Sequence, residues 1–341
     1  MSRILFVYPF QLSASALEQE WRTLYPPLGL LYLAAFVRDY GHTVSFYDGT
    51  FKEAEHAEFD VELTKFNADV VCIGSLITVR PDAIELAARA HKSGITTILG
   101  GPDPTLAAEE YLNSGVVDWV IRGEGERSLL QLQELIPSGE EYSNIPGIAY
   151  IDSAGQIITT SDPQVVPELD DLPYPARDLI DMQAYADIWR FEHGYISVNL
   201  SASRGCALGC SYCQSSQPGA HFRIRSAKSV TAEMFSIQES YAPCRFRLVD
   251  DLDGLGAEWL TELAGEMEAA GVTVPFEGLR LHQSLGELPQ LERTKELCAD
   301  RNSWIPKSES HPHAPPGLDI GTLQARWRHA RLEPGETLAE P

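Results

Sequence analysis

Three cysteines that lie close together in the sequence have a spacing typical of a metal-cluster loop. Cys206, Cys210 and Cys213 follow a C-x3-C-x2-C pattern, so one short loop could aim three thiolates at a single point. Gly205 and Gly209 would let that loop wrap closely, because glycine adopts positive φ at little cost. Four cysteines are the usual complete ligand set of a cubane cluster. Three thiolates therefore predict a 4Fe–4S cluster with one iron left open for a substrate or cofactor.

A structural zinc site and a disulfide framework suit these cysteines less well. A structural zinc site takes four ligands, and no second C-x2-C pair and no H-x3-H pair occurs in the chain. A disulfide framework needs many cysteines in a short secreted chain, whereas this chain has six in 341 residues. The sequence therefore favours the iron–sulfur cluster over both.

Composition narrows the class of protein. The length of 341 residues suffices for two domains, and the 44% hydrophobic content is ordinary for a soluble protein. A net charge of −23 argues against binding a nucleic-acid backbone. No apolar run reaches the roughly 20 residues of a membrane span. The apolar run at residues 4–10 is too short for a signal peptide, so we expect a cytoplasmic protein with free cysteines.

The elements that must position these residues begin with an alternation of strands and helices. Short apolar, β-rich runs predict strands at Arg3–Tyr8, Thr43–Tyr47, Asp69–Gly74, Ile95–Leu99 and Asp118–Ile121. Amphipathic segments between them predict helices, of which the first begins near Leu28. This alternation predicts an α/β fold with a doubly wound, flavodoxin-like parallel sheet.

Three loops follow strands of that sheet, at Ser75–Arg80, Gly100–Pro104 and Gly123–Glu126, and the last two contain glycines. Ligands of such sheets bind beyond the carboxyl ends of the strands. Each glycine could be a plain tight turn, but three such loops on one edge favour a flat, backbone-lined ligand platform. The candidate ligand contacts are Ser75, Thr78, Gly100, Gly101, Gly123, Glu124 and Gly125. No G-x-G-x-x-G follows the first strand and no G-x4-G-K-[ST] occurs, so a nucleotide fingerprint is absent.

Further elements lead to and from the cysteines. The sequence predicts a hairpin at 147–160, a linker rich in Pro and Asp at 163–177, and strands at Ile196–Leu200, Phe246–Val249 and Val272–Leu279. Helices are expected at Ser226–Glu239 and around Trp259, Leu263 and Met267. The proline-rich residues 303–341 lack a sustained apolar period and predict an irregular tail.

The cysteine segment resembles the signature of the radical S-adenosylmethionine (SAM) enzymes, C-x3-C-x-aromatic-C, with Tyr212 as the aromatic residue. The resemblance implies that the three cysteines bind a 4Fe–4S cluster whose free iron chelates the amino and carboxylate groups of SAM. It also implies a partial (β/α) barrel, of which this chain supplies about three βα units. A small-molecule substrate and an external electron donor of the flavodoxin or ferredoxin type are implied as partners.

The first half of the chain resembles the cobalamin-binding domain that precedes many radical SAM domains. The resemblance lies in Pro-Pro-Leu-Gly-Leu at 26–30, Gly-Gly-Pro-Asp-Pro-Thr at 100–105 and Gly-Glu-Gly-Glu at 123–126. No Asp-x-His-x-x-Gly occurs in the chain. This resembles the subgroup in which the lower face of the corrin rests on the protein without a histidine ligand, and Ser75–Arg80 would lie near that face.

The resemblance also suggests SAM contacts beyond the cysteines. Asp250 and Asp251 follow a strand at the place where radical SAM enzymes usually carry a Gly-Gly-Glu-like sequence. A carboxylate there would hold the ammonium of SAM. The alternative is a turn with Asp at a helix N-cap, which we prefer for Asp253. Arg280 falls where relatives have an arginine and is a candidate contact of cofactor or substrate.

The expected domain organisation follows from these motifs. Residues 1–140 form a cobalamin-binding Rossmann-like domain, 141–190 a hairpin and linker, 191–300 a partial radical SAM core, and 301–341 an irregular tail. The implied activity is methyl transfer to an unactivated carbon or phosphorus centre. Two alternatives stay open: radical cyclisation or rearrangement with the same cofactors, and a truncated chain that holds cobalamin and a cluster without turnover.

Overall fold

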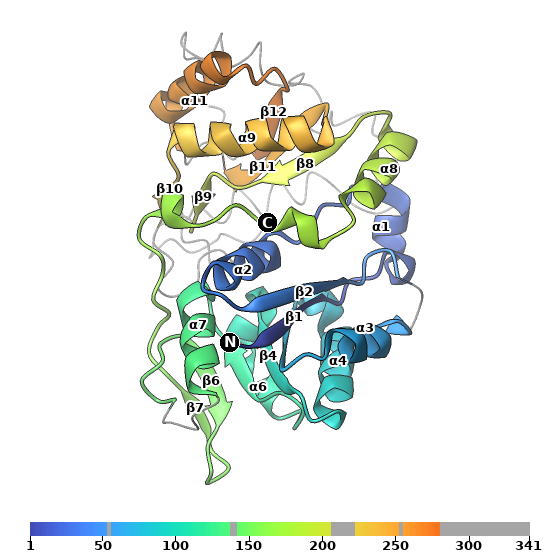
Figure 1. Cartoon of the computed structure of the whole chain (residues 1–341), viewed down its shortest axis with the longest axis vertical. Coiled ribbons are helices and arrows are strands. Elements are labelled where there is room, and N and C mark those ends of the chain that lie inside the picture. Colours follow the sequence, from blue (N-terminus) through green and yellow to red (C-terminus); the bar gives the residue numbers. More distant parts are fainter. Residues whose placement is uncertain (53–55, 137–141, 206–221, 252–254, 280–341) are drawn as a thin grey trace, which may run out of the picture.

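The first sheet has seven strands, and five of them are parallel. The structure is a computed structural model of the chain that describes residues 1–52, 56–136, 142–205, 222–251 and 255–279 (Figure 1). The strands are β1 (Arg3–Tyr8), β2 (Thr43–Asp48), β3 (Val70–Gly74), β4 (Thr96–Gly100), β5 (Trp119–Ile121), β6 (Ile148–Ile151) and β7 (Ile157–Thr159). Their order is β2-β1-β3-β4-β5-β6-β7. The order of the five parallel strands is that of flavodoxin, so the predicted doubly wound sheet is confirmed.

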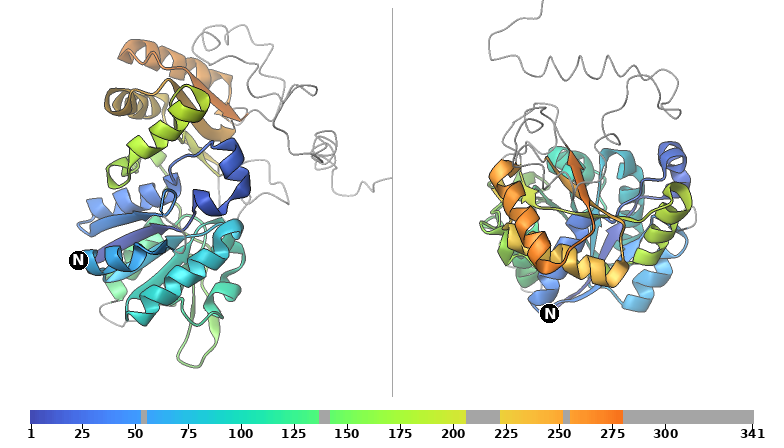
Figure 2. Two further views of the ribbon diagram at one scale, coloured as in Figure 1. Left: turned by 90° about the vertical axis from the view of Figure 1, so that its right-hand side faces the viewer. Right: turned by 90° about the horizontal axis from the view of Figure 1, so that it is seen from above.

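Helices cover both faces of this sheet (Figure 2). The covering helices are α2 (Leu28–Asp39), α3 (Phe59–Phe66), α4 (Arg80–Lys92), α6 (Ala108–Leu112) and α7 (Glu126–Leu135). Two short helices, α1 (Ala16–Trp21) and α5 (Pro102–Leu106), precede α2 and follow β4. In β1, Ile4 and Phe6 pack in the core under α2 and α7, whereas Leu5 and Val7 pack in the core under α3 and α4. Successive side chains of a strand point to opposite faces, which explains why this strand is apolar throughout.

The predicted hairpin, β6 and β7, pairs antiparallel and extends the first sheet from β5. A second sheet holds β8 (Ser197–Leu200), β11 (Arg245–Asp251) and β12 (Phe276–Leu279), all parallel, in the order β12-β11-β8. Helices α9 (Ala227–Tyr241) and α11 (Ala257–Ala270) connect its strands. The expected βα units are therefore present in this region. The two-strand pair of β9 (Ser203–Arg204) and β10 (Arg223–Ile224) was not predicted.

One prediction for this half was wrong in detail, and one helix was not predicted. The strand expected from Val272 begins only at Phe276, because Val272 N donates to Met267 O at 2.9 Å and thereby closes the end of α11. The unpredicted helix is α8 (Met182–His193), which follows the predicted linker at 163–177. Its start is capped by Asp181, whose side chain accepts hydrogen bonds from Gln183 N and Ala184 N. Its buried face repeats with helical spacing, at Met182, Tyr185, Ala186 and Trp189.

The second half of the chain is joined to the residues that precede α2. Trp189 Nε1 donates to Leu24 O at 2.6 Å, and Asn199 Nδ2 donates to Pro26 O at 3.0 Å. Tyr25 Oη lies 2.9 Å from Ser197 Oγ. These buried hydrogen bonds fix α8 and β8 against the first half, because an unpaired polar group there would carry a desolvation cost.

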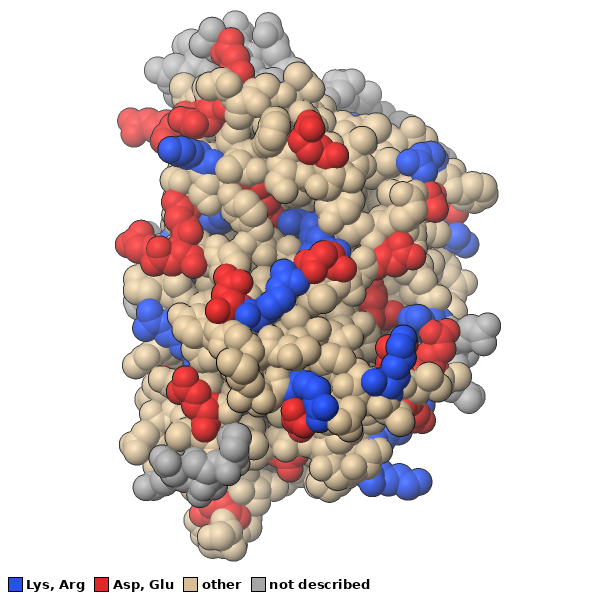
Figure 3. All heavy atoms as spheres, in the orientation of Figure 1, with Lys and Arg blue, Asp and Glu red and all other residues tan. Residues whose placement is uncertain are grey.

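Charged side chains are spread over both halves on the face shown in Figure 3, where many Lys and Arg lie beside Asp and Glu. The acidic excess of the sequence is therefore scattered on this face. None of the helices in the described ranges is long and apolar enough to cross a lipid bilayer.

Candidate functional site

The carboxyl ends of β3 and β4 meet in two adjacent loops that are held together by backbone contacts. Ser75 N donates to Gly100 O at 2.9 Å. Gly101 has a φ of 106°, and a Cβ at this position would lie 2.8 Å from Ser75 O. Only glycine fits such a close approach without strain. Ser75 itself is buried, with its Oγ 2.8 Å from Tyr111 Oη, so its hydroxyl faces the fold.

The loop after β3 and the short helix α5 after β4 expose apolar side chains. The exposed residues there are Leu76 (39%), Ile77 (64%), Thr78 and Leu106 (62%). Of the residues predicted here, Thr78 is therefore accessible, and Gly100 and Gly101 shape the backbone beside it. Exposed large apolar residues that gather at one place indicate a binding surface. The apolar members were not among the predicted contacts, although they lie within or beside the predicted loops.

An arginine anchors the base of these loops. Arg80 donates to both oxygens of Asp103 at 2.7 Å and also pairs with Glu110. Tyr111 Oη donates to Asp103 Oδ2 at 2.5 Å. The hydrogen bonds from Arg80 hold the pKa of Asp103 below its usual range despite its burial. Burial, followed by the contact with Asp103, raises the pKa of Tyr111 to about 12. This network fixes the loop after β4 against the loop after β3.

The third predicted loop, Gly123–Glu126 after β5, is joined to the second half of the chain. Glu124 pairs with Arg204 at 3.2 Å and with Arg223, and Glu126 pairs with Arg204 at 2.6 Å. Burial alone would lower the pKa of Arg204, but Glu126 and Glu124 outweigh it and raise the value. The carboxylate of Glu124, predicted as a cofactor contact, is thus occupied by arginines.

The glycines beside Glu124 let this loop pack closely. Gly123 has a φ of 69°, and its N donates to Thr105 Oγ1 at 2.9 Å. A Cβ on Gly125 would lie 3.1 Å from Ile121 Cγ2 and 3.4 Å from Leu33 Cδ2. Both glycines therefore serve the close packing of the loop against α2 and the sheet.

The strand that leads to the cysteines is held by Asp250. One Asp250 oxygen accepts from Ser203 N and Ser203 Oγ at 2.6 Å, and the other accepts from Ala202 N at 2.7 Å. Burial raises the pKa of Asp250, although these hydrogen bonds oppose the shift. Asp250 therefore fixes the residues just before Gly205. Its contact with SAM stays a prediction.

A buried ion cluster lies beside this strand. Glu233 is 1% exposed and accepts from Arg177 Nη1 at 2.8 Å and from Arg225 Nη1. Arg177 also donates to Asn199 O, and Arg225 donates to Ser201 O, both at 2.8 Å. The cluster thus joins the segment before α8, the strand β8 and the helix α9.

Several predicted site residues lie outside the described residues. These are Cys206, Cys210, Tyr212, Cys213 and Arg280, and the side chain of Asp251 is likewise not described. Within the parts of the chain that are described, no group of three or more His, Cys, Asp and Glu could hold a metal ion. The cysteine ligands of a cluster therefore stay a prediction from their spacing.

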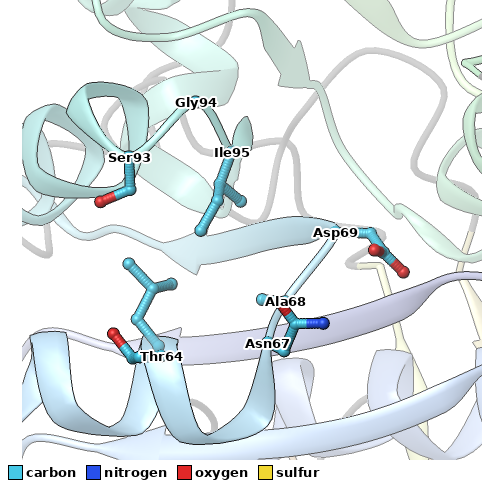
Figure 4. Close-up of a pocket in the computed structure, with 8 residues that line it drawn as sticks. Thr64, Asn67, Ala68, Asp69, Ser93, Gly94 and Ile95 are labelled. Carbon is cyan, nitrogen blue, oxygen red and sulfur yellow. The ribbon is translucent and has the colours of Figure 1, made fainter.

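A shallow pocket of about 490 Å³ lies at the opposite edge of the first sheet (Figure 4). Its lining includes Asn67, Ala68 and Asp69 before β3, and Ser93 to Ile95 before β4. These are the amino ends of the strands. Because ligands of doubly wound sheets bind at the carboxyl ends, this pocket is separate from the candidate site.

The predicted site residues did not include Arg204 and Arg223, which flank the cysteine segment and contact the first half. The sequence signal that could have found them is complementary charge. Two arginines flank the predicted cluster loop, and an acidic Gly-Glu-Gly-Glu loop occurs elsewhere in the chain.

Comparison with known proteins finds a known domain in the first half of the chain. The B12 binding domain family matches residues 19–133. An uncharacterized methyltransferase of Pyrococcus horikoshii is 28% identical over 279 residues, which cover 80% of this chain and 59% of that protein. The anaerobic magnesium-protoporphyrin IX monomethyl ester cyclase of Rubrivivax gelatinosus is 26% identical over 263 residues, covering 73% of this chain and 45% of the cyclase.

Solved structures show the same fold. The cobalamin-dependent S-adenosylmethionine radical enzyme OxsB, with aqua-cobalamin and S-adenosylmethionine bound, superimposes with a TM-score of 0.68 at 14% identity. The match covers 88% of this chain and 43% of OxsB. The chain thus spans about half the length of the proteins it matches. The chain therefore contains a match to the B12 binding domain and has the fold of cobalamin-dependent radical SAM enzymes.

Proposed function

We propose that this chain is a cobalamin-dependent radical SAM enzyme that transfers a methyl group to an unactivated carbon or phosphorus centre. The observation that carries the proposal is the exposed apolar edge at β3 and β4, which lies within the B12 binding domain match. Cobalamin and SAM, when bound, would supply the methyl group and a 5′-deoxyadenosyl radical.

The residues of this edge fit a corrin ring. A broad macrocycle needs a flat, partly apolar surface, and Leu76, Ile77 and Leu106 provide exposed apolar side chains in adjacent loops. The backbone at Gly101 lies close to Ser75, so it does not protrude between these side chains. No histidine occurs in Ser75–Arg80 or Gly100–Leu106, so these loops offer no imidazole to cobalt. The ring would rest on Ile77 and Thr78.

The second half of the chain brackets this edge. At β2, Tyr185 Oη donates to Asp48 Oδ2 at 2.7 Å, and at β5, Arg204 and Arg223 hold Glu124. The ends of β3 and β4 lie between these two contacts in the strand order. A ligand on the edge would therefore be covered by the half that carries the cysteines. Such cover excludes water, which radical chemistry requires.

The cluster and its SAM would be held by Cys206, Cys210 and Cys213, with Tyr212 beside them. Asp251 and Arg280 stay candidate contacts of SAM or substrate. We also propose a small-molecule substrate and an external reductant of the flavodoxin or ferredoxin type.

The test is anaerobic reconstitution of the full chain with iron, sulfide and hydroxocobalamin, followed by SAM and a reductant. We expect about four irons per chain, the content of one such cluster, and release of 5′-deoxyadenosine. The triple variant Cys206→Ala, Cys210→Ala, Cys213→Ala should lose the iron and the SAM cleavage but keep cobalamin. Iron content equal to wild type in that variant would contradict the assignment.

A second variant tests the apolar edge. Ile77→Asp places a charge beneath the proposed ring, and we expect cobalamin affinity to fall at least about tenfold, because a charge buried against an apolar face is strongly unfavourable. Val61→Asp, at an exposed apolar position of α3, is the matched control and should bind as wild type does. Equal affinity in the two variants would place cobalamin elsewhere.

Radical cyclisation is the second candidate, because one matched relative is a magnesium-protoporphyrin ester cyclase. SAM with an isotope-labelled methyl group separates the two reactions. A methyltransferase gives labelled product, whereas a cyclase gives unlabelled product with 5′-deoxyadenosine. A chain that binds both cofactors and forms no 5′-deoxyadenosine would be a binding protein only.

A further inference from the structure

The segment that carries the cysteines begins and ends at two arginines that face each other. In the antiparallel pair of β9 and β10, Arg204 lies directly opposite Arg223. Like charges directly opposite each other destabilise a strand pair. The pair is only two residues long on each strand, so its backbone hydrogen bonds offer little to offset the repulsion. Something must hold the arginines together.

Glu124 lies between them. Its Oε2 accepts from Arg204 Nη1 at 3.2 Å, and its Oε1 accepts from Arg223 Nη2. One carboxylate therefore neutralises the repulsion by giving one oxygen to each guanidinium. Arg204 is held further by Glu126 and by the ring of Tyr32, whose centroid lies 5.0 Å from Cζ. Figure 1 shows β9 and β10 between α9 on one side and α2 and α7 on the other.

We propose that Glu124 is a positioning residue: by holding Arg204 and Arg223 together, it sets where residues 205–222 begin and end relative to the cobalamin-binding half. In this role it does not contact the corrin. Both of its oxygens have an arginine partner and its side chain is 17% exposed, whereas Ile77 on the open part of the edge is 64% exposed. The loss of the carboxylate should loosen the strand pair and leave the corrin surface intact.

The direct test is hydrogen exchange of the purified full chain, which needs no cofactor. In Glu124→Gln, we expect the amides of Arg204, Arg223 and Ile224 to exchange about tenfold faster, because a hydrogen bond to a charged group is lost. Peptide-resolved mass spectrometry measures this. Glu62→Gln, in the exposed pair with Lys65, is the matched control and should exchange as wild type does. Unchanged exchange in Glu124→Gln would overturn the proposal.

A second variant separates this role from general damage to the fold. Once Glu124 is gone, Arg204 and Arg223 repel each other, so removal of one arginine should help. We expect Glu124→Gln with Arg223→Gln to exchange about threefold more slowly than Glu124→Gln alone, as the cross-strand repulsion disappears. If the double variant exchanges faster than Glu124→Gln, the arginines do not oppose each other and the proposal is wrong.

Cobalamin binding tests whether Glu124 contacts the corrin or only positions the arginines, and this test rests on the proposed function. We expect Glu124→Gln to bind hydroxocobalamin within about twofold of wild type, since a side chain that does not touch the ligand contributes little to affinity. A tenfold weaker affinity would make Glu124 a corrin contact and overturn the assignment. A wild-type chain that binds no cobalamin would count against the proposed function, while the exchange rates would still decide the role of Glu124.

Discussion

Two glutamates of this chain each lie between two arginines, and they differ in burial. Glu233 and its partners Arg177 and Arg225 have side-chain exposures of 1%, 5% and 5%. Glu124 is 17% exposed, and its partners Arg204 and Arg223 are 17% and 12% exposed. The charged members of the first cluster all lie in the second half of the chain, although Arg225 also donates to Tyr32 Oη of α2 at 3.3 Å. The second cluster pairs charges of the two halves.

Because the two clusters differ in burial, we expect them to have different roles, although each consists of a glutamate between two arginines. Removing one member of a deeply buried cluster leaves an uncompensated charge away from water, which is strongly unfavourable. A partly exposed cluster is screened by solvent, so its loss is cheaper. Glu233 should therefore decide whether the second half folds. Glu124 should decide how that half is placed on the first.

The largest effect is expected for Glu233→Gln. Both Arg177 and Arg225 would keep their charge with no carboxylate between them, so we expect the free energy of unfolding to fall by about 3–5 kcal/mol. Urea denaturation of the full chain measures it. Glu262→Gln, at an exposed position of α11, is the matched control and should change stability by less than about 0.5 kcal/mol. A loss as small as that of the control would show that the buried cluster contributes no stability.

The next effect concerns Asp103, which shares Arg80 with Glu110 and is 3% exposed. Asp103→Asn should lower the free energy of unfolding at pH 7 by about 2 kcal/mol, the value of hydrogen bonds to a charged group. The pKa of Asp103 is lowered in the fold, so its contribution is present above the unfolded pKa and is lost as the pH falls through the folded pKa.

The pH series makes that prediction specific. Wild type and Asp103→Asn should differ most above the unfolded pKa of the carboxyl group and converge below its lowered folded pKa, because the carboxylate of wild type is then protonated. Denaturation curves at several pH values measure the difference. A difference that grows as the pH falls would contradict the sign of the shift.

A smaller effect is expected for the global stability of Glu124→Gln. Since this cluster is partly exposed, we expect a loss of about 1 kcal/mol in the free energy of unfolding, reduced further by salt. Denaturation at low and high ionic strength measures it. A loss equal to that of Glu233→Gln would erase the distinction between the two clusters.

The smallest effect is expected for the surface pair of Lys65 and Glu62, which are 74% and 36% exposed and 3.7 Å apart. Lys65→Ala should change stability by less than about 0.5 kcal/mol, because solvent screens such a pair. Thermal unfolding against wild type measures it. A larger loss would mean that the exposure of an ion pair does not determine how much the pair contributes to stability.

The sequence by itself determined the parallel strands of the first sheet and their class. The continuous apolar run at Arg3–Tyr8 predicted a strand buried on both faces, and the alternation with helices predicted the parallel sheet. The glycines after the strands predicted the loops, because their backbone demands are local. The spacing of Cys206, Cys210 and Cys213 predicts a cluster in the same local way. Helix α8 could also have been found, since its cap at Asp181 and its apolar face from Met182 to Trp189 are local signals.

Only the tertiary structure decided which charges meet. Glu124 lies 80 positions from Arg204 and 99 from Arg223. No periodicity in the sequence links residues so far apart, so the sequence analysis assigned Glu124 to the cofactor. Asp250 likewise reaches Ser203 across 47 positions. A carboxylate looks alike in sequence whether it holds a ligand or a guanidinium, because the choice depends on which partner the packing of the two sheets brings within hydrogen-bond distance.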